Sequence, residues 1–269
     1  MLRLGVGQME PVVHDQDGNM EKMRELLSSA AKEDVDVLVL PELLNSGYFF
    51  ENQEEAIEMS EQIPGGRFSS ELKKWSKKNR MVVAGIDEKT EEGLYNSAAV
   101  FGNGKHLATY RKIHLFDAEK IWFLPGQEVS PIINFKNYRF GVIICYDWAF
   151  PELSRILALN GAQVILHPAN LLLSYCPRAM ITRSIENWIF TATASRIGVE
   201  RGTKFLGFSQ VTDPRGHILL QMDASEHGVA WVDVDPAVAD EKMITKQNNV
   251  LKDRRPELYG SLAEILHKE

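Results

Sequence analysis

The chain passes twice through one order of elements, and this internal repeat constrains its fold more than any other feature. Each half has a strand, a helix, a second strand, a second helix, a third strand and a hairpin, as hydrophobic periodicity and turn residues indicate. The strands expected in the first half are residues 2–8, 35–40 and 81–86, followed by a hairpin around the GNGK turn at 102–105. Those expected in the second half are residues 139–145, 163–167 and 188–195, followed by a hairpin around the DPRG turn at 213–216.

The helices between these strands have apolar residues at helical spacing. Phe68, Leu72 and Trp75 lie at i, i+4 and i+7 in the second helix of the first half. In the second half, a helix begins with Pro151 at its first position and ends at Asn160, directly before a glycine, which is standard start and stop chemistry. The last expected helix covers about residues 178–187.

The strands are almost entirely apolar, so both faces of each sheet have to be buried. Two sheets that pack on each other, each covered on its outer face by a helix pair, satisfy this requirement. The sequence therefore predicts an α/β fold, a four-layer α-β-β-α sandwich built from two similar halves. Because no Pro/Gly/Ser-rich linker divides it, residues 1–269 are interpreted as a single domain.

Composition narrows the function classes. A net charge of −7 gives no general attraction for polyanions, so neither nucleic acid nor an anionic membrane is an expected partner. No signal-peptide pattern and no apolar run of about 18 residues is found, which favours a soluble cytoplasmic protein. Two cysteines cannot form a disulfide framework. Metal-ligand spacings, a phosphate-binding loop and a GxSxG elbow are missing, so no metal or other cofactor is expected.

Three polar residues stand directly beyond apolar strands: Glu42, Lys112 and Cys145. Each alone has an ordinary structural explanation, since an isolated cysteine on an apolar strand is usually a small buried hydrophobe. In α/β sheets, however, ligands bind beyond the carboxyl ends of the strands, where these three side chains can converge. A thiol, a carboxylate and an ammonium together indicate an activated nucleophile with its base and its oxyanion stabiliser.

The segments PELLNSGY, YRKIHLF and ICYDWAFPE resemble the three signature segments of the nitrilase superfamily, also called the carbon-nitrogen hydrolases. The resemblance extends from Gly7 to about Tyr259. It implies that Glu42 is the general base, Lys112 the cationic stabiliser and Cys145 the nucleophile. It also implies the same four-layer sandwich and a homodimer or larger homo-oligomer, with the tail at about residues 245–269 at the interface.

A fourth residue implied by the resemblance is Glu119, in the segment EKIWFLPG, which would hold Lys112 or the substrate in position. Glu42 follows a buried strand, whereas Glu119 is expected on an irregular stretch, so Glu42 is the better candidate for repeated proton transfer. The mechanism implied is attack by the Cys145 thiolate, stabilisation of the oxyanion by Lys112 and the backbone N–H of Tyr146, release of ammonia and hydrolysis of a thioester.

The substrate is constrained by the residues near the nucleophile. No cation follows Cys145 within a few residues, unlike in omega-amidases and carbamoylases, so a substrate carboxylate is disfavoured unless Arg178 reaches the site. A mainly neutral small molecule is expected instead. The candidate substrate-binding residues are Tyr48, Trp148, Asn170 and Tyr175.

Two alternatives remain for the substrate: an amide or a nitrile. The Cys-Tyr-Asp sequence at the nucleophile favours an amidase, whereas HPANL and YCPRAM resemble a group of small thermophilic enzymes described as nitrilases or amidases. A non-catalytic binding protein on the same fold is a less expected alternative. Cys176 is expected on a loop, as a pocket wall or packing residue.

Overall fold

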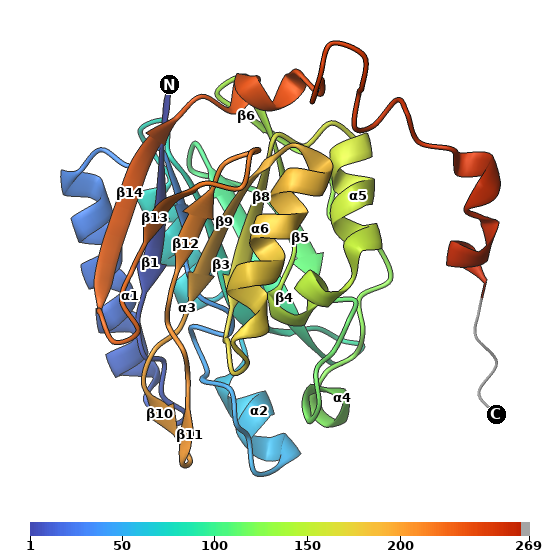
Figure 1. The fold of residues 1–269 in the computed structure, drawn as a ribbon. Helices are drawn as coiled ribbons and strands as arrows, with labels where there is room; N and C mark the ends of the chain where they lie inside the picture. The colour runs from blue at the N-terminus through green and yellow to red at the C-terminus, as the bar shows by residue number, and fades with distance from the viewer. Residues whose placement is uncertain (265–269) are drawn as a thin grey trace.

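The computed structural model describes residues 1–264 as two six-stranded sheets that face each other between two pairs of helices (Figure 1). This is the four-layer α-β-β-α sandwich that the sequence predicts. In the first sheet the strand order is β14-β1-β2-β3-β4-β5, and in the second it is β13-β12-β9-β8-β7-β6.

Strands of the first sheet come from both ends of the chain: β1 Leu2–Gln8, β2 Val37–Val39, β3 Met81–Lys89, β4 Leu94–Gly102, β5 Lys105–Arg111 and β14 Gly228–Val234. The second sheet contains β6 Ile133–Phe135, β7 Tyr138–Val142, β8 Val164–Ala169, β9 Phe190–Ser195, β12 Gln210–Thr212 and β13 Ile218–Gln221. The runs β1-β2-β3 and β7-β8-β9 are parallel, and the remaining pairs of both sheets are antiparallel. The two sheets therefore have the same order of strands, as the internal repeat in the sequence predicts.

Two strands of the six-stranded sheets were not expected from the sequence. Strand β14 pairs antiparallel with β1 along its whole length, from Leu2 opposite Val234 to Gln8 opposite Gly228. The short strand β6 has the equivalent place beside β7. Strand β14 is only partly buried, so it lacks the continuous apolar run by which the other strands are recognised. It joins the C-terminal half of the chain to the first sheet.

Helices α1 Gln16–Lys32 and α3 Arg67–Trp75 cover the first sheet, and α5 Pro151–Leu159 and α6 Tyr175–Asn187 cover the second (Figure 1). Helix α5 begins and ends where its proline and its Asn-Gly stop predict. Helix α6 begins one turn earlier than expected, so the prediction that Cys176 lies on a loop is wrong: it is a buried residue of the first turn of α6.

Inward-facing side chains of both sheets form one core between them, for instance Val39 and Val83 from the first sheet and Val142 and Leu166 from the second. A separate core lies between the first sheet and its helices. The expected strand over 139–145 is too long, because β7 ends at Val142. Cys145 instead begins a short 3-10 helix, Cys145–Ala149, with a φ of 39° that no strand residue adopts.

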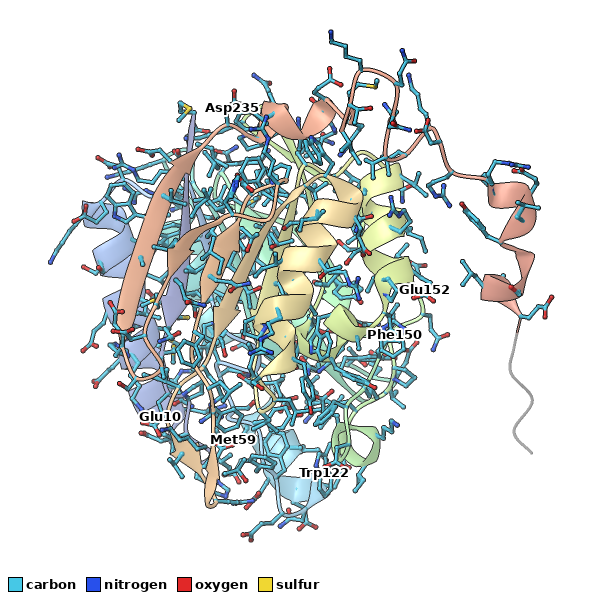
Figure 2. All side chains as sticks on the ribbon, in the orientation of Figure 1. Glu10, Met59, Trp122, Phe150, Glu152 and Asp235 are labelled. Carbon is cyan, nitrogen blue, oxygen red and sulfur yellow. The ribbon has the colours of Figure 1, made fainter. Side chains whose placement is uncertain are left out.

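Small elements gather at one end of the sandwich: α2 Gln53–Met59, α4 Glu119–Trp122 and the hairpin of β10 Val199–Glu200 with β11 Thr203–Lys204 (Figure 1). Figure 2 shows Met59 and Trp122, the last residues of α2 and α4, at this end of the molecule. Within residues 1–264, no helix is both long and apolar enough to cross a membrane.

Candidate active site

The residues singled out beyond the strands meet in the interior, beside Glu119 of α4: Lys112 contacts Glu42 and Glu119, and the charges of Glu42 and Lys112 act on the Cys145 thiol. Glu42 follows β2, Lys112 directly follows β5, and Cys145 follows β7. Glu119 is the first residue of α4, so the expectation of an irregular stretch there is wrong. All four side chains are almost completely buried.

Strand β3 fixes the backbone around Glu42. The N–H of Gly85 donates to the carbonyl of Pro41 at 2.9 Å, and the N–H of Leu44 donates to the carbonyl of Gly85 at 2.9 Å. A Cβ atom at Gly85 would lie 2.3 Å from the Cα of Glu42, closer than real Cβ contacts. Only glycine at position 85 allows the two backbones to approach in this way, so the carboxylate is held on the rigid part of the fold.

Lys112 bridges two carboxylates. Its Nζ lies 2.7 Å from Oε1 of Glu42 and 2.7 Å from Oε1 of Glu119. Its backbone is fixed on both sides, because its N–H donates to Asn96 and its carbonyl accepts from Gly126, each at 2.8 Å. Burial alone would lower the pKa of Lys112, but Glu119 and Glu42 outweigh it and raise the pKa above its ordinary value. The amine is therefore an ammonium at neutral pH.

Glu119 and Glu42 receive further hydrogen bonds. The Tyr48 hydroxyl donates to Oε1 of Glu119 at 2.9 Å, and the N–H of Phe116 donates to its Oε2 at 3.1 Å. Burial raises the pKa of Glu119 to about 7, with Lys112 opposing this shift and Glu42 adding to it. The Asn96 side chain donates to Oε1 of Glu42 at 2.6 Å. The other oxygen of Glu42, Oε2, is buried and has no hydrogen-bond partner in the described part of the chain.

Cys145 is held in a left-handed conformation that commonly costs about 1–3 kcal/mol for a residue with a side chain. The Asp147 carboxylate supports the turn by accepting from the N–H of Ile144 at 2.9 Å and from the Tyr110 hydroxyl at 2.8 Å. Burial lowers the pKa of His167 to about 4, so its ring is neutral and donates from Nε2 to the carbonyl of Cys145 at 3.0 Å. Burial and the charge of Glu42 raise the pKa of the Cys145 thiol.

A narrow pocket of about 30 Å³ opens beside Cys145. Its lining is mainly apolar: Phe116, Tyr146, Trp148, Asn170 and the run from Leu171 to Leu173. The Cys145 thiol donates to the Asn170 carbonyl at 3.8 Å. Both polar atoms of the Asn170 side chain are buried without a hydrogen-bond partner among residues 1–264. A buried amide of this kind needs a partner from a ligand or from water.

Only two of the four candidate substrate-binding residues line the pocket beside Cys145. Trp148 and Asn170 line the pocket, whereas the hydroxyl of Tyr48 is directed to Glu119. Tyr175, in the first turn of α6, is 62% exposed and is not among the residues that line the pocket. Arg178 is also exposed on α6 and outside the pocket lining.

Sequence reasoning missed several residues of the site, above all Asn96, His167 and Gly85. Asn96 and His167 could have been found, because each is a polar residue within a mainly apolar strand. A polar side chain in such a place needs a buried partner. Gly85 gave no comparable signal, since its role depends on the approach of a segment more than 40 residues away.

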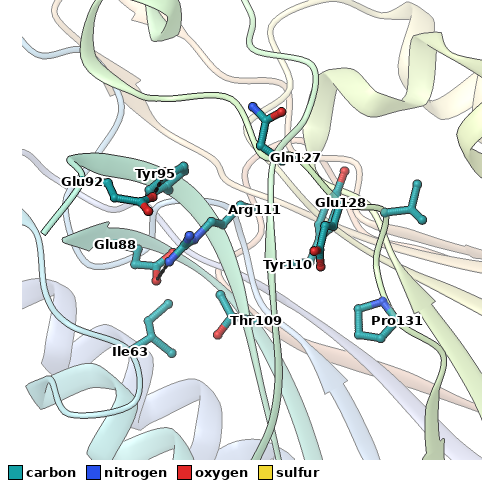
Figure 3. A pocket seen from close by; sticks show the side chains of 11 residues that line it. Ile63, Glu88, Glu92, Tyr95, Thr109, Tyr110, Arg111, Gln127, Glu128 and Pro131 are labelled. Carbon is teal, nitrogen blue, oxygen red and sulfur yellow. Dashed lines mark hydrogen bonds and ion pairs between the residues drawn. The ribbon is translucent and has the colours of Figure 1, made fainter. Parts of the chain in front are cut away.

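A wider cavity of about 460 Å³ lies elsewhere, beside β4 and β5 (Figure 3). Two of the charged residues that line it, Arg111 and Glu88, are paired with each other. Arg111 donates to both carboxylate oxygens of Glu88 at 2.9 Å, and its guanidinium stacks 4.1 Å from the centre of the Tyr95 ring. Over the described residues, no cluster of three or more His, Cys, Asp or Glu side chains could hold a metal ion.

A buried thiol beside two carboxylates and an ammonium, between the sheets of an α-β-β-α sandwich, defines a class of hydrolase with a cysteine nucleophile. The profile of one such family, described as carbon-nitrogen hydrolase, matches residues 3–242. The chain belongs to this carbon-nitrogen hydrolase family, and Cys145 stands at the expected active-site position.

Relatives and solved structures agree with this assignment. The chain is 41% identical over 260 residues to a nitrilase of Pyrococcus abyssi, across 96% of this chain and 99% of the relative. It is 32% identical over 258 residues to an omega-amidase of Homo sapiens, across 90% of this chain and 91% of the relative. An amidase from Nesterenkonia sp. superposes with a TM-score of 0.80 at 26% identity, across 96% and 95% of the two chains.

Proposed function

We propose that this hydrolase cleaves a small, mainly neutral amide to a carboxylic acid and ammonia. The observation that carries the proposal is the narrow apolar pocket beside Cys145, in which the Asn170 side chain has no hydrogen-bond partner from the described residues. The space beside the thiol is narrow, about 30 Å³, which favours a compact group. The side-chain amide of Asn170 offers such a group hydrogen-bond donors and an acceptor.

In the proposed reaction, Glu42 removes the thiol proton of Cys145 through its free oxygen Oε2, and the thiolate attacks the amide carbon. The C–N bond breaks as Glu42 returns the proton to the nitrogen, so ammonia leaves and a thioester remains. Water then attacks the thioester carbon after giving a proton to Glu42. The C–S bond breaks, the acid leaves, and the proton returns to the sulfur.

The oxyanion formed in each half of the reaction needs a fixed positive partner. The Lys112 ammonium is held between Glu42 and Glu119, and the backbone N–H of Tyr146 lies next in sequence to the nucleophile. Loss of one such group commonly costs about 2.7–4 kcal/mol of transition-state stabilisation. Glu119 holds Lys112 in place rather than transferring protons.

Similar proteins support a small substrate. One solved structure of the Nesterenkonia amidase, 25% identical to this chain, has the acetamide moiety of fluoroacetamide attached to its active-site cysteine. A nitrile is the second candidate, because the relative from Pyrococcus abyssi is described as a nitrilase. A non-catalytic binding protein is the least supported alternative.

Ammonia release from acetamide, propionamide, acetonitrile and glutaramate distinguishes these candidates, with Cys145→Ala as the inactive control. Turnover of acetamide or propionamide at least tenfold faster than acetonitrile supports the proposal. Faster turnover of acetonitrile favours the nitrilase alternative. A preference for glutaramate, which carries a carboxylate, contradicts the assignment of a neutral substrate, and no turnover of any compound favours the binding protein.

We also propose a homo-oligomer, a single domain and a cytoplasmic location, as the sequence predicts. Large apolar residues are exposed on α5 and in the C-terminal tail, namely Ile156, Leu159, Leu258 and Leu262. Such residues are suited to a subunit interface. Part of the predicted interface segment, residues 265–269, lies outside the described residues. Light scattering that gives a monomer of about 30 kDa with full activity contradicts the oligomer.

A further inference from the structure

A buried ion pair of the second half, Arg196 with Glu200, lies close enough to the active site for the charge of Glu42 to act on Arg196. Arg196, which follows β9, is completely buried, and its Nη1 lies 3.3 Å from Oε2 of Glu200 on β10. Its Nη2 also donates to the carbonyl of Pro11 at 2.6 Å, and the guanidinium stacks 3.9 Å from the centre of the Phe205 ring. A buried charge is costly without a partner, so Arg196 and Glu200 keep each other in place.

Glu200 also holds the loop after Glu42. Its Oε2 accepts hydrogen bonds from the backbone N–H groups of Tyr48 and Phe49, both at 2.8 Å. Gly47 precedes them with a φ of 82°, and a Cβ atom there would lie 2.6 Å from Oε1 of Glu200. The carboxylate is thus fitted directly against the loop, and it fixes the backbone from which the Tyr48 side chain projects.

The Tyr48 hydroxyl reaches the catalytic cluster. It donates to Oε1 of Glu119, the same oxygen that faces Nζ of Lys112. Burial raises the pKa of Tyr48 well above its ordinary value, with Glu119 adding to the shift, so the phenol stays protonated and remains a donor. Because a donor favours the charged form of a carboxylate, the hydroxyl opposes the burial that drives Glu119 toward protonation.

We propose that Glu200 and Tyr48 are positioning residues: Glu200 fixes the Tyr48 loop, and the Tyr48 hydroxyl keeps Glu119 ionised and directed at Lys112. The inference rests on the proposed function, in which Glu119 holds Lys112. It assigns Tyr48 to the support of the catalytic cluster, in place of the substrate contact expected from the sequence.

The proposal predicts a change in pH dependence. The charged and titratable groups around Glu119 are Lys112, Glu42, the Cys145 thiol and Tyr48. Without the Tyr48 hydroxyl, Glu119 becomes protonated at a higher pH than in the wild type. The acid side of the activity profile then moves to higher pH by about one unit, which is about a tenfold loss at pH 6. Activity at pH 9 changes much less, because Glu119 is ionised there in both proteins.

The test compares Tyr48→Phe and Glu200→Gln with two matched controls. Tyr95→Phe removes a hydroxyl that donates to Glu92 at 2.7 Å beside the wider cavity (Figure 3). Glu61→Gln changes a carboxylate that accepts from the backbone N–H groups of Phe68 and Ser69, as Glu200 does from its loop. For each variant, kcat and KM for acetamide are measured from pH 5 to 10, together with the rate of Cys145 alkylation by iodoacetamide.

Support requires three results. Tyr48→Phe moves the acid limb of kcat and the corresponding inflection of the alkylation profile to higher pH. Glu200→Gln moves both in the same direction, and Glu200→Asp restores part of the difference. Neither control variant moves them. Unchanged profiles in a folded Tyr48→Phe protein overturn the proposal, even if Glu200→Gln fails to fold.

The alkylation measurement separates this inference from the proposed function. If the wild type hydrolyses no amide or nitrile, the proposed function fails, yet the pH profile of alkylation still reports the ionisation of Glu119 beside Cys145. If the wild type is active and only the profiles of the variants stay unchanged, the proposed function stands and the positioning role of Tyr48 and Glu200 is wrong.

Discussion

Gly85→Ala tests whether the approach of β3 to the loop after β2 sets the position of the Glu42 carboxylate, the proposed general base. The added Cβ would lie 2.3 Å from Cα of Glu42 and 2.7 Å from N of Leu43. Ordinary contacts between carbon atoms begin at about 3.5 Å, so the two segments have to separate by about 1 Å. That displacement shifts the backbone that carries Glu42 and so changes the position of its carboxylate relative to Cys145 and Lys112.

A displacement of about 1 Å in a catalytic group can cost about 100-fold in rate, or about 2.7 kcal/mol. Overpacking a well-packed core costs about 1–3 kcal/mol of stability, which lowers the Tm of a chain of this size by a few degrees. We therefore expect Gly85→Ala to remain folded, with kcat/KM for acetamide reduced about 100-fold. The substitution should therefore reduce activity strongly while it lowers the stability of the fold only slightly.

The assay is ammonia release from acetamide, with circular dichroism and thermal unfolding measured on the same samples. Gly65→Ala is the matched control, because a Cβ atom at Gly65 meets nothing within 4 Å. We expect that control to keep wild-type activity. If Gly85→Ala retains kcat/KM within about threefold of the wild type, the backbone adjusts without moving Glu42 and the reasoning is refuted.

Three further predictions follow from the site. Glu42→Gln should prevent both turnover and acyl-enzyme formation, whereas Glu119→Gln should lower amide turnover yet leave Cys145 open to iodoacetamide; mass spectrometry showing the reverse pattern exchanges their roles. Cys176→Ala should keep substantial activity, because Cys176 is buried in α6, and a loss equal to that of Cys145→Ala contradicts this. Burial lowers the pKa of His167 from about 6.5 in the unfolded chain to about 4 in the folded protein. As pH falls from about 6.5 to 4, His167 becomes protonated in the unfolded chain but stays neutral in the folded protein, so the stability of the folded protein should decrease. His167→Gln should flatten that fall in Tm, and an unchanged slope excludes His167 as its source.

Sequence reasoning predicted the layers because they depend on patterns that repeat along the chain. The apolar strands and the amphipathic helices have to bury their faces, and two copies of one unit satisfy this together. It missed β14, because that strand is only partly buried and its partner β1 lies more than 200 residues away. It placed Cys145 in a strand, because composition does not reveal a backbone φ of 39°.

For the site, the sequence was sufficient to single out Glu42, Lys112 and Cys145, since each follows a segment that the sequence predicts as a strand. The structure decided what surrounds them. It directs the Tyr48 hydroxyl to Glu119, leaves Tyr175 exposed and places beside the thiol an Asn170 side chain that has no hydrogen-bond partner among residues 1–264. These outcomes depend on side-chain directions set by loops far apart in the chain.

The sequence by itself thus determined the chemical groups and the order of the elements, because residue type and periodicity are local properties. Only the tertiary structure decided which groups share a buried space. Lys112 meets Glu42 and Glu119 at 2.7 Å because β2, β5 and α4 converge at one end of the sandwich. Burial there changes the pKa of Glu119 and of the Cys145 thiol, and it is the exclusion of water by both halves that gives these ordinary side chains their unusual ionisation.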